Sequence, residues 1–191
     1  TLWHTLSLHD ALPISSRELA EVASRHGVPL IVDGAQSLGA THSGRPAGDG
    51  ADAVVLSFSP GKALEAGEGA VILTDRDDLR ERLIRDTQHP YRQHLQLGTP
   101  DVNEFALNCR IHPVAARIAS RRWGRALRDV AERQRCSETL VEQAIETGLV
   151  DPCRLPPGVC SSCHRVTVPL RPGASSGDLA AALGLRGRPV H

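Results

Sequence analysis

The order of apolar and polar positions in the first half of the chain changes from a helical period to a strand period. Residues 17–27 place apolar side chains on one side and charges on the other and end in a glycine, which predicts a short amphipathic helix. Residues 28–32 and 53–58 are continuous apolar runs typical of buried strands, and residues 69–74 read as another strand. A glycine-rich loop is predicted over residues 41–50.

The next part of the chain is predicted to be mainly helical. Asp75 is predicted to cap a helix that reaches Asp86, with carboxylates early and arginines along its length. Residues 89–100 read as an irregular connection. Residues 104–147 read as mostly helical, with a break near Pro113.

The C-terminal part mixes strand and helix signals. Residues 155–158 (LPPG) indicate a linker, residues 164–170 alternate as a strand, and Ser176 begins a helix. The preceding order of helix, three strands and helix is typical of the interior of a three-layer α/β/α domain. The predicted fold class is therefore α/β, with part of such a domain followed by the start of a small α+β domain.

Composition excludes several kinds of partner. The 22 basic and 22 acidic residues leave no net charge, which argues against a nucleic-acid or anionic-membrane surface. Aromatic residues make up only 3% of the chain, so a base-stacking surface is not expected either. No apolar stretch is long enough to span a membrane. Five cysteines without an export signal predict reduced thiols and a cytoplasmic location.

The most informative single residue is Lys62, the only lysine in the chain. Arginine can replace lysine where only positive charge is needed, but a guanidinium stays protonated and cannot attack a carbonyl. Lys62 follows the apolar run 53–58 in a Ser/Pro/Gly turn, where a parallel sheet presents its chemistry. A solvated surface lysine is the alternative interpretation.

Asp33 and Gln36 follow one predicted strand, and Ser57 and Lys62 lie at the end of another. This set suits pyridoxal phosphate: an amine for the Schiff base and a carboxylate, expected to be buried, that keeps the ring nitrogen protonated. Gln36 can donate a hydrogen bond to the ring phenolate oxygen, and Ser57 can bind the phosphate. No metal site is predicted.

The segment IVDGAQSLGA, with DAVVLSFSPGKALEAGEGAVILTD after it, resembles the DegT/DnrJ/EryC1/StrS family of sugar aminotransferases. The family's D-x-x-Q and S-F-x-x-x-K steps fall on Asp33, Gln36, Ser57 and Lys62. The resemblance implies a fold-type-I enzyme in which these residues contact the pyridine nitrogen, the phenolate, the phosphate and the Schiff-base carbon, respectively. It also implies transfer of an amino group from an amino acid, glutamate being favoured, to a keto sugar linked to a nucleotide.

Asn108 begins a stretch, Asn-Cys-Arg, that resembles the family's N-Y-R step, with cysteine in the aromatic position. In the family this asparagine reaches the cofactor phosphate of the neighbouring subunit, so the resemblance implies a homodimer. The resemblance also implies two parts of the chain. Residues 16–115 would be the C-terminal part of the cofactor-binding large domain, and residues 116–191 a linking helix and a truncated small domain. Residues 1–15 match nothing in the family and are expected to be a non-native leader. The chain is expected to be a fragment.

The sequence leaves two other classes of function open. D-x-x-Q also occurs in class V aminotransferases and cysteine desulfurases, although these usually carry His directly before the Schiff-base lysine, where Gly61 stands here. The stretch from Cys160 to His164 spells C-x-x-C-H, a haem-attachment pattern, and together with Cys153 it could bind zinc. Of the other histidines, His94 and His112 are candidates to lie near the cofactor.

Overall fold

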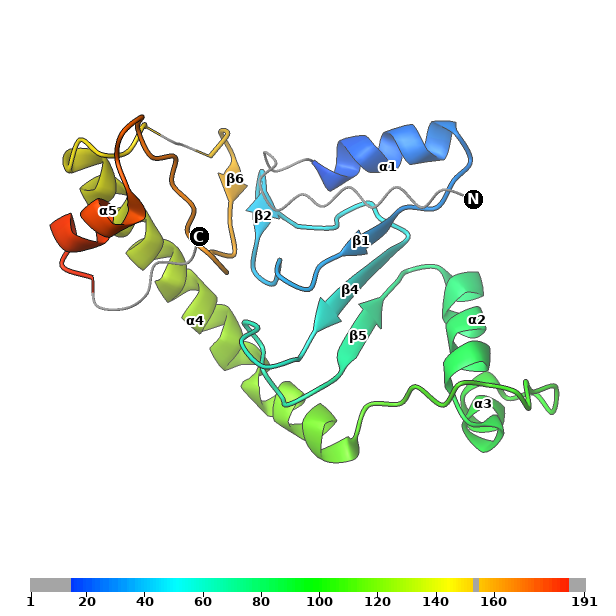
Figure 1. Ribbon diagram of the computed structural model, residues 1–191. Helices are drawn as coiled ribbons and strands as arrows, with labels where there is room; N and C mark the ends of the chain where they lie inside the picture. The colour runs from blue at the N-terminus through cyan, green and yellow to red at the C-terminus, as the bar shows by residue number, and fades with distance from the viewer. Residues whose placement is uncertain (1–14, 153–154, 186–191) are drawn as a thin grey trace.

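The computed structural model describes residues 15–152 and 155–185. The predicted leader, apart from residue 15, lies outside these ranges. Figure 1 shows the arrangement of the elements. In chain order they are α1 (Ser16–Arg25), β1 (Ile31–Asp33), β2 (Thr41–His42), β3 (Arg45–Pro46), β4 (Ala53–Ser57), β5 (Ala70–Leu73), α2 (Asp77–Thr87), α3 (Pro90–Leu97), α4 (Pro113–Glu146), β6 (Val159–Cys160) and α5 (Ser176–Ala182).

A mixed sheet with the strand order β1-β4-β5 carries the first half of the chain. β1 runs parallel to β4, with Asp33 opposite Val55, and β4 runs antiparallel to β5, with Ser57 opposite Ala70. The strands near residues 53–58 and 69–74 are confirmed. Since β1 and β4 are parallel, both deliver the residues that follow them to the same edge of the sheet.

The expectation that the first strand, β1, is buried is wrong. β1 spans three residues of which Ile31 is 62% exposed, and on β5 Leu73 is 47% exposed. These two strands are the edges of the three-stranded sheet, and only the central strand β4 has neighbours on both sides. The apolar run correctly indicated a strand but overestimated how much of it is covered.

A second small sheet, with the order β3-β2-β6, joins distant parts of the chain. β2 and β3 form a short hairpin inside the predicted loop 41–50, and β2 also pairs with β6, where Thr41 faces Cys160. The predicted strand 164–170 is wrong: its described residues form only an isolated bridge between Leu170 and Val150.

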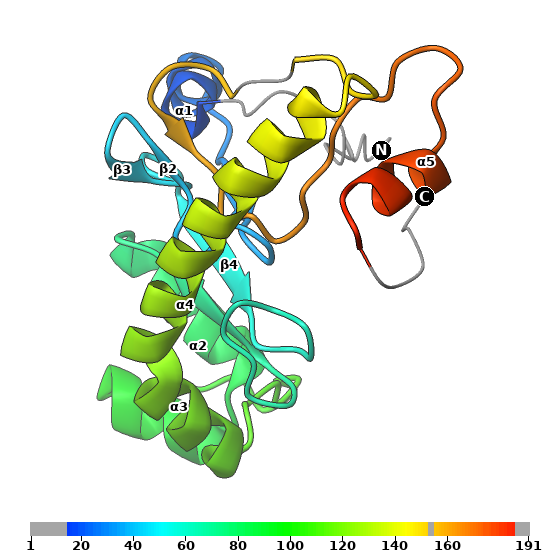
Figure 2. The same cartoon turned by 90° about the vertical axis from the view of Figure 1, so that its left-hand side faces the viewer.

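The long helix α4 begins at Pro113 and continues without a break to Glu146. The His112 ring nitrogen accepts a hydrogen bond from the Val114 N–H at 3.2 Å, and proline fits the first helical position because its missing N–H would have no intrahelical partner. The expected break near Pro113 is therefore the start of the helix, and residues 104–112 are not helical. Figure 2 shows α4 running along one side of the molecule.

The region predicted as an irregular connection contains α3 instead. His89 caps this helix, Pro90 opens it, and Gly98 ends it in the left-handed conformation with φ 66°. The buried Gln93 amide fixes the following loop: its nitrogen donates to the Asn103 carbonyl at 3.0 Å, and its oxygen accepts from the Asn103 N–H at 2.7 Å. The proline and glycine flanking α3 were usable helix signals.

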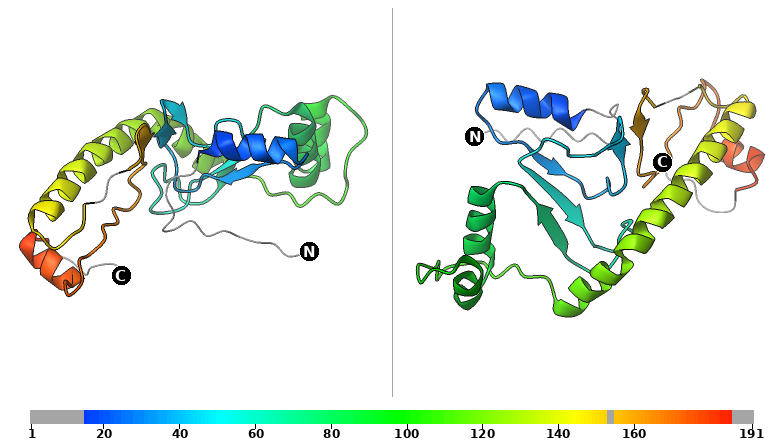
Figure 3. Two further views of the ribbon diagram at one scale, coloured as in Figure 1. Left: turned by 90° about the horizontal axis from the view of Figure 1, so that it is seen from above. Right: turned by 180° about the vertical axis from the view of Figure 1, so that it is seen from behind.

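The other helices largely follow the sequence pattern. The Ser15 side chain caps α1 by accepting from the Glu18 N–H, and α5 begins where predicted with a capping box between Ser175 and Asp178. α2 is capped by Arg76 rather than Asp75. Figure 3 shows α2 and α3 at one end of the molecule and α5 at the other. None of the described helices combines the length and apolar character that crossing a membrane requires.

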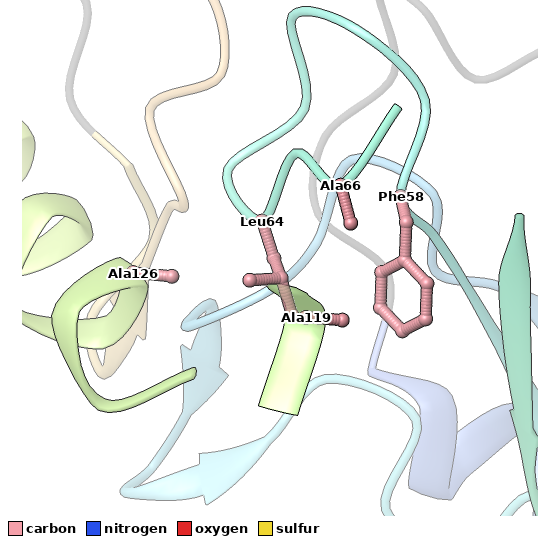
Figure 4. Packing of buried hydrophobic residues seen from close by; sticks show 5 residues of the cluster. All are labelled: Phe58, Leu64, Ala66, Ala119 and Ala126. Atoms are coloured by element: carbon pink, nitrogen blue, oxygen red, sulfur yellow. The ribbon is translucent and has the colours of Figure 1, made fainter. Parts of the chain in front are cut away.

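The main core cluster lies between the turn after β4 and α4. Figure 4 shows Phe58, Leu64 and Ala66 of this turn facing Ala119 and Ala126 of the helix. Leu64 is 2% exposed and fills the space that the two small alanines leave. The turn that carries Lys62 is therefore fixed by apolar packing directly beneath it.

Candidate functional site

The loop after β1 passes very close to β4. A Cβ added at Gly34 would lie 2.9 Å from Leu56 Cδ2, so only glycine allows this approach, and the Gly34 N–H donates to the Val55 carbonyl at 2.8 Å. Asp33 precedes this contact but is exposed, and its carboxylate accepts a hydrogen bond from the Ala35 N–H at 2.9 Å. The expectation of a buried carboxylate at Asp33 is wrong for this structure, because its strand lies at an edge of the sheet.

The turn after β4 holds Lys62 in a fixed, half-buried position. The Lys62 N–H donates to the Ser59 carbonyl at 3.2 Å, and Gly61 before it has φ +80°, which favours glycine. Arg122 of α4 donates to the Glu65 carbonyl at 2.7 Å and ties the turn to the helix. Within the described residues, no hydrogen bond or ion pair is found for the Lys62 amine.

Ser57 at the end of β4 belongs to a short chain of hydroxyl contacts. Its hydroxyl donates to the Ser59 hydroxyl at 3.2 Å and accepts from the Ser59 N–H at 3.3 Å. Ser59 in turn donates to Glu68 at 3.0 Å. These contacts fix the orientation of the Ser57 side chain at the carboxyl edge of the sheet.

A small pocket at this edge contains three of the predicted site residues: Gln36, Ser57 and Lys62 line it together. Asp33 and Asn108 do not line it. The enclosed space is about 10 Å³, which is room for one water molecule. Its full lining is Gly34, Ala35, Gln36, Leu38, Leu56, Ser57, Phe58, Lys62, Ala63, Leu64, Trp123, Arg133, Ser162 and His164.

The far wall of the pocket comes from the segment after β6, which the sequence pattern did not indicate. Ser162 is 6% exposed and its hydroxyl donates to the Gln36 carbonyl at 2.5 Å. On α4, the Gln134 amide donates to the Ser161 carbonyl at 2.7 Å and to the Gly39 carbonyl at 3.3 Å. Both contacts hold this segment against the loop after β1.

Of the described histidines only His164 lines the pocket, whereas His94 and His112, the two candidates from the sequence, do not. The His94 ring contacts the Thr99 carbonyl at 2.9 Å, and His112 caps α4. His164 lies in the C-x-x-C-H pattern, and its position depends on the pairing of β6 with β2, which local sequence periodicity does not reveal.

The titratable side chains that line the pocket are all basic. Its lining contains Lys62, Arg133 and His164 but neither aspartate nor glutamate. Burial lowers the pKa of the His164 imidazole, and the nearby charges of Lys62, Arg165 and Arg133 lower it further. The neutral imidazole is therefore favoured at neutral pH, which leaves it able both to donate and to accept a hydrogen bond.

Asn108 lies elsewhere on the surface. It is exposed, with the left-handed φ of 49° that asparagine tolerates better than most residues. On either side of it, the Leu107 N–H donates to the Asp86 carbonyl and the Cys109 N–H to the Thr87 carbonyl, at 2.9 and 2.8 Å. The segment is thus fixed to the end of α2 and does not reach the pocket of its own chain.

The pocket residues match the functional groups of pyridoxal phosphate: an amine for the aldehyde, a hydroxyl for the phosphate and an amide for the phenolate oxygen. No carboxylate in the lining competes for the Lys62 amine.

The cysteines of the C-x-x-C-H pattern are half-buried thiols. Burial raises the pKa of the Cys160 thiol, with smaller contributions from Cys163 and Glu138. Among the described residues, no group of three or more His, Cys, Asp or Glu side chains is placed to hold a metal ion. Cys153, which the zinc alternative needs, lies outside the described residues.

Comparison with known proteins identifies relatives of this chain. The Pleiotropic regulatory protein of Geobacillus stearothermophilus is 33% identical over 141 residues, covering 70% of this chain and 36% of that protein. The dTDP-3-amino-3,4,6-trideoxy-alpha-D-glucose transaminase of Streptomyces venezuelae is 36% identical over 92 residues, covering 48% of this chain and 24% of that protein. The chain thus spans about a quarter to a third of these curated relatives.

Solved structures show the same fold. The crystal structure of DesI in the presence of its TDP-sugar product matches 91% of this chain and 45% of its own, with a TM-score of 0.66 and 26% identity. The chain therefore has part of the fold-type-I aminotransferase fold, which confirms the predicted fold class. The sequence profile of the DegT/DnrJ/EryC1/StrS aminotransferase family matches residues 13–185. The chain belongs to this family.

Proposed function

We propose that the protein carrying this chain is a pyridoxal-phosphate-dependent sugar aminotransferase. It moves an amino group from an amino acid, with glutamate as the proposed donor, to a keto group on a nucleotide-linked sugar. The observation that carries the proposal is the position of Lys62, a half-buried lysine that lines a pocket together with Gln36 and Ser57. The family, and the TDP-sugar product named for DesI, support the same reaction class.

When bound, the cofactor supplies an electron sink that stabilises negative charge at the donor's α-carbon. Lys62 would hold the cofactor at its aldehyde carbon, and its amine would move the proton at the donor's α-carbon, first as base and then as acid. Ser57 binds the phosphate and Gln36 donates to the phenolate oxygen. Asp33 would keep the ring nitrogen protonated through the carboxylate oxygen that does not accept from the Ala35 N–H.

The proposal also covers the assembly, the domains and the location of the whole protein. Asn108 serves the cofactor phosphate of a second copy in a homodimer, which fits its exposure and its distance from the pocket of its own chain. Phe105 and Leu107 beside it are 93% and 77% exposed, and covering such apolar side chains favours association. Residues 16–115 and 116–191 form the large-domain and small-domain parts, and the protein is cytoplasmic.

Replacing Lys62 by arginine in the enzyme that carries this chain tests the proposal. Lys62→Arg keeps the charge but removes the nucleophile and the proton carrier, so amino transfer from glutamate should fall by more than ~100-fold. Release of 2-oxoglutarate measures it. Arg121→Lys, a change at an exposed position of α4, is the control and should keep full activity. Undiminished transfer by Lys62→Arg would contradict the assignment.

The matched family favours transamination over the desulfurase-like and haem alternatives.

A further inference from the structure

The exposed side of α4 carries its charges in two halves of opposite sign. Figure 2 looks onto this side of the helix. Its first half carries exposed arginines that recur every three or four residues and therefore share one face: Arg117, Arg121, Arg125 and Arg128. Its last turns carry exposed glutamates at a spacing of four residues: Glu138, Glu142 and Glu146. The buried residues of α4, such as Ala126 and Val130, lie on the other side.

This order of charges opposes the dipole of the helix. A helix N-terminus favours negative side chains, and a C-terminus favours positive ones. The first turn of α4 has no acidic residue, the last turn has no basic residue, and the helix ends on Glu146. The charges of the exposed side therefore add nothing to the stability of α4 through its dipole, which indicates that they serve a contact outside the helix.

The chain itself uses few of these charges. Arg125 pairs with Asp129 at 3.5 Å. Within residues 15–152 and 155–185, no ion pair is found for Arg121, Glu142 or Glu146. Opposite charges that do not meet within one chain are available to meet between two chains.

Gly124 lies in the middle of this helix and is exposed. Glycine destabilises a helix interior. A Cβ at this position would meet only the end of the Arg128 side chain, at 3.7 Å, so nothing in the described part of the chain requires glycine here. The missing side chain does allow the backbone of a second helix to approach closely.

A second α4 that runs in the opposite direction complements both halves. The basic half of one helix then lies against the acidic half of the other, and two-fold symmetry makes each contact twice. In one register Arg121 lies opposite Glu146 of the second copy. A step of four residues along each helix places Arg125 opposite Glu142 of the second copy, so both pairs join opposite charges.

We propose that the exposed side of α4 is an interface with a second copy of this chain, in which the two α4 helices pack antiparallel. The charges orient the two helices, and salt weakens the contact because exposed ion pairs are screened. The interface does not depend on the proposed activity. It is also separate from the contact proposed at Asn108, which uses none of these charges.

Charge reversal in the purified enzyme that carries this chain tests the interface by sedimentation equilibrium. Arg121→Glu and Glu146→Arg each place like charges opposite one another in the symmetric pair, so each alone should weaken this association by at least ~10-fold. An equimolar mixture of the two variants should associate as the unmodified enzyme does, because the changed residues then face each other with opposite charge. Arg92→Glu, the same change at an exposed position of α3, is the matched control and should associate normally.

The unmodified enzyme should have twice the mass of the assembly that remains in either single variant. Its association should also fall in about 1 M salt, where the Debye length is about 3 Å. Mixing cannot restore a binding site for a different acidic partner or repair a destabilised helix, so recovery in the mixture identifies the antiparallel pair. Association that is insensitive to salt, an equal loss in Arg92→Glu, or a mixture that stays dissociated would each overturn the proposal. A pair of subunits that persists in both single variants belongs to the contact at Asn108.

Discussion

Leu64→Ala tests whether packing beneath the Lys62 turn holds the site in place. The Leu64 side chain is 2% exposed and lies between Phe58 and the alanines of α4 at positions 119 and 126. Those alanines have no atoms that could move into the space, and a continuous helix cannot collapse toward it. The cavity should therefore persist, and the loss of stability should lie in the upper part of the usual range, at ~3–4 kcal/mol.

Urea unfolding followed by far-UV circular dichroism measures this change. A domain of ordinary stability has about 5–15 kcal/mol in total, so the urea midpoint of Leu64→Ala should fall markedly. Leu95→Ala is the control, because Leu95 is 58% exposed on α3 and should change stability by less than ~0.5 kcal/mol. A loss below ~1 kcal/mol for Leu64→Ala, or an equal loss for both variants, would refute the packing argument.

Two further changes test single contacts. Asp52 accepts from the Leu30 N–H at 2.8 Å and from Arg76 at 2.7 Å, and the Arg76 contact first, then that of Leu30, lowers its pKa. Its stabilisation is thus present above the unfolded pKa of about 3.9 and is lost as pH falls through the folded value. Asp52→Asn should lower the Tm at pH 7 and reduce its fall below pH 4, and an unchanged pH dependence would contradict this. Ser162→Ala removes the hydroxyl donated to the Gln36 carbonyl and should cost ~1–2 kcal/mol in urea unfolding, whereas a cost below ~0.3 kcal/mol would show that the contact does not hold the segment.

The local sequence pattern was sufficient to predict the strands and the turn that carry Lys62. The apolar run of β4, the turn rich in Ser, Pro and Gly, and the run of β5 are neighbours in sequence and in space. The spacing from Ser57 to Lys62 is therefore preserved when the chain folds. Pro113 shows the opposite error, since the sequence pattern placed a break in a helix there although proline is common at the first helical position, where Pro90 of α3 also stands.

Long-range pairing explains what the sequence did not reveal. The contact between β2 and β6 joins Thr41 to Cys160, and a strand of two residues leaves no periodic signal. That pairing brings His164 into the pocket. Arg133 is one of many arginines on a helix, and only the folded arrangement shows that it lines the pocket. The exposure of Asp33 likewise depends on which strands flank β1, which the apolar run alone does not specify.

Reductive capture of the cofactor tests the central claim most directly. The chain is treated with excess pyridoxal phosphate, reduced with borohydride, digested and mapped by mass spectrometry. Lys62 is the only lysine, so the N-terminal amine serves as an internal measure of nonspecific labelling. The account predicts an adduct on the peptide that contains Lys62, in excess of that on the N-terminal amine. Labelling of the N-terminal amine alone, or no adduct on Lys62, would contradict it.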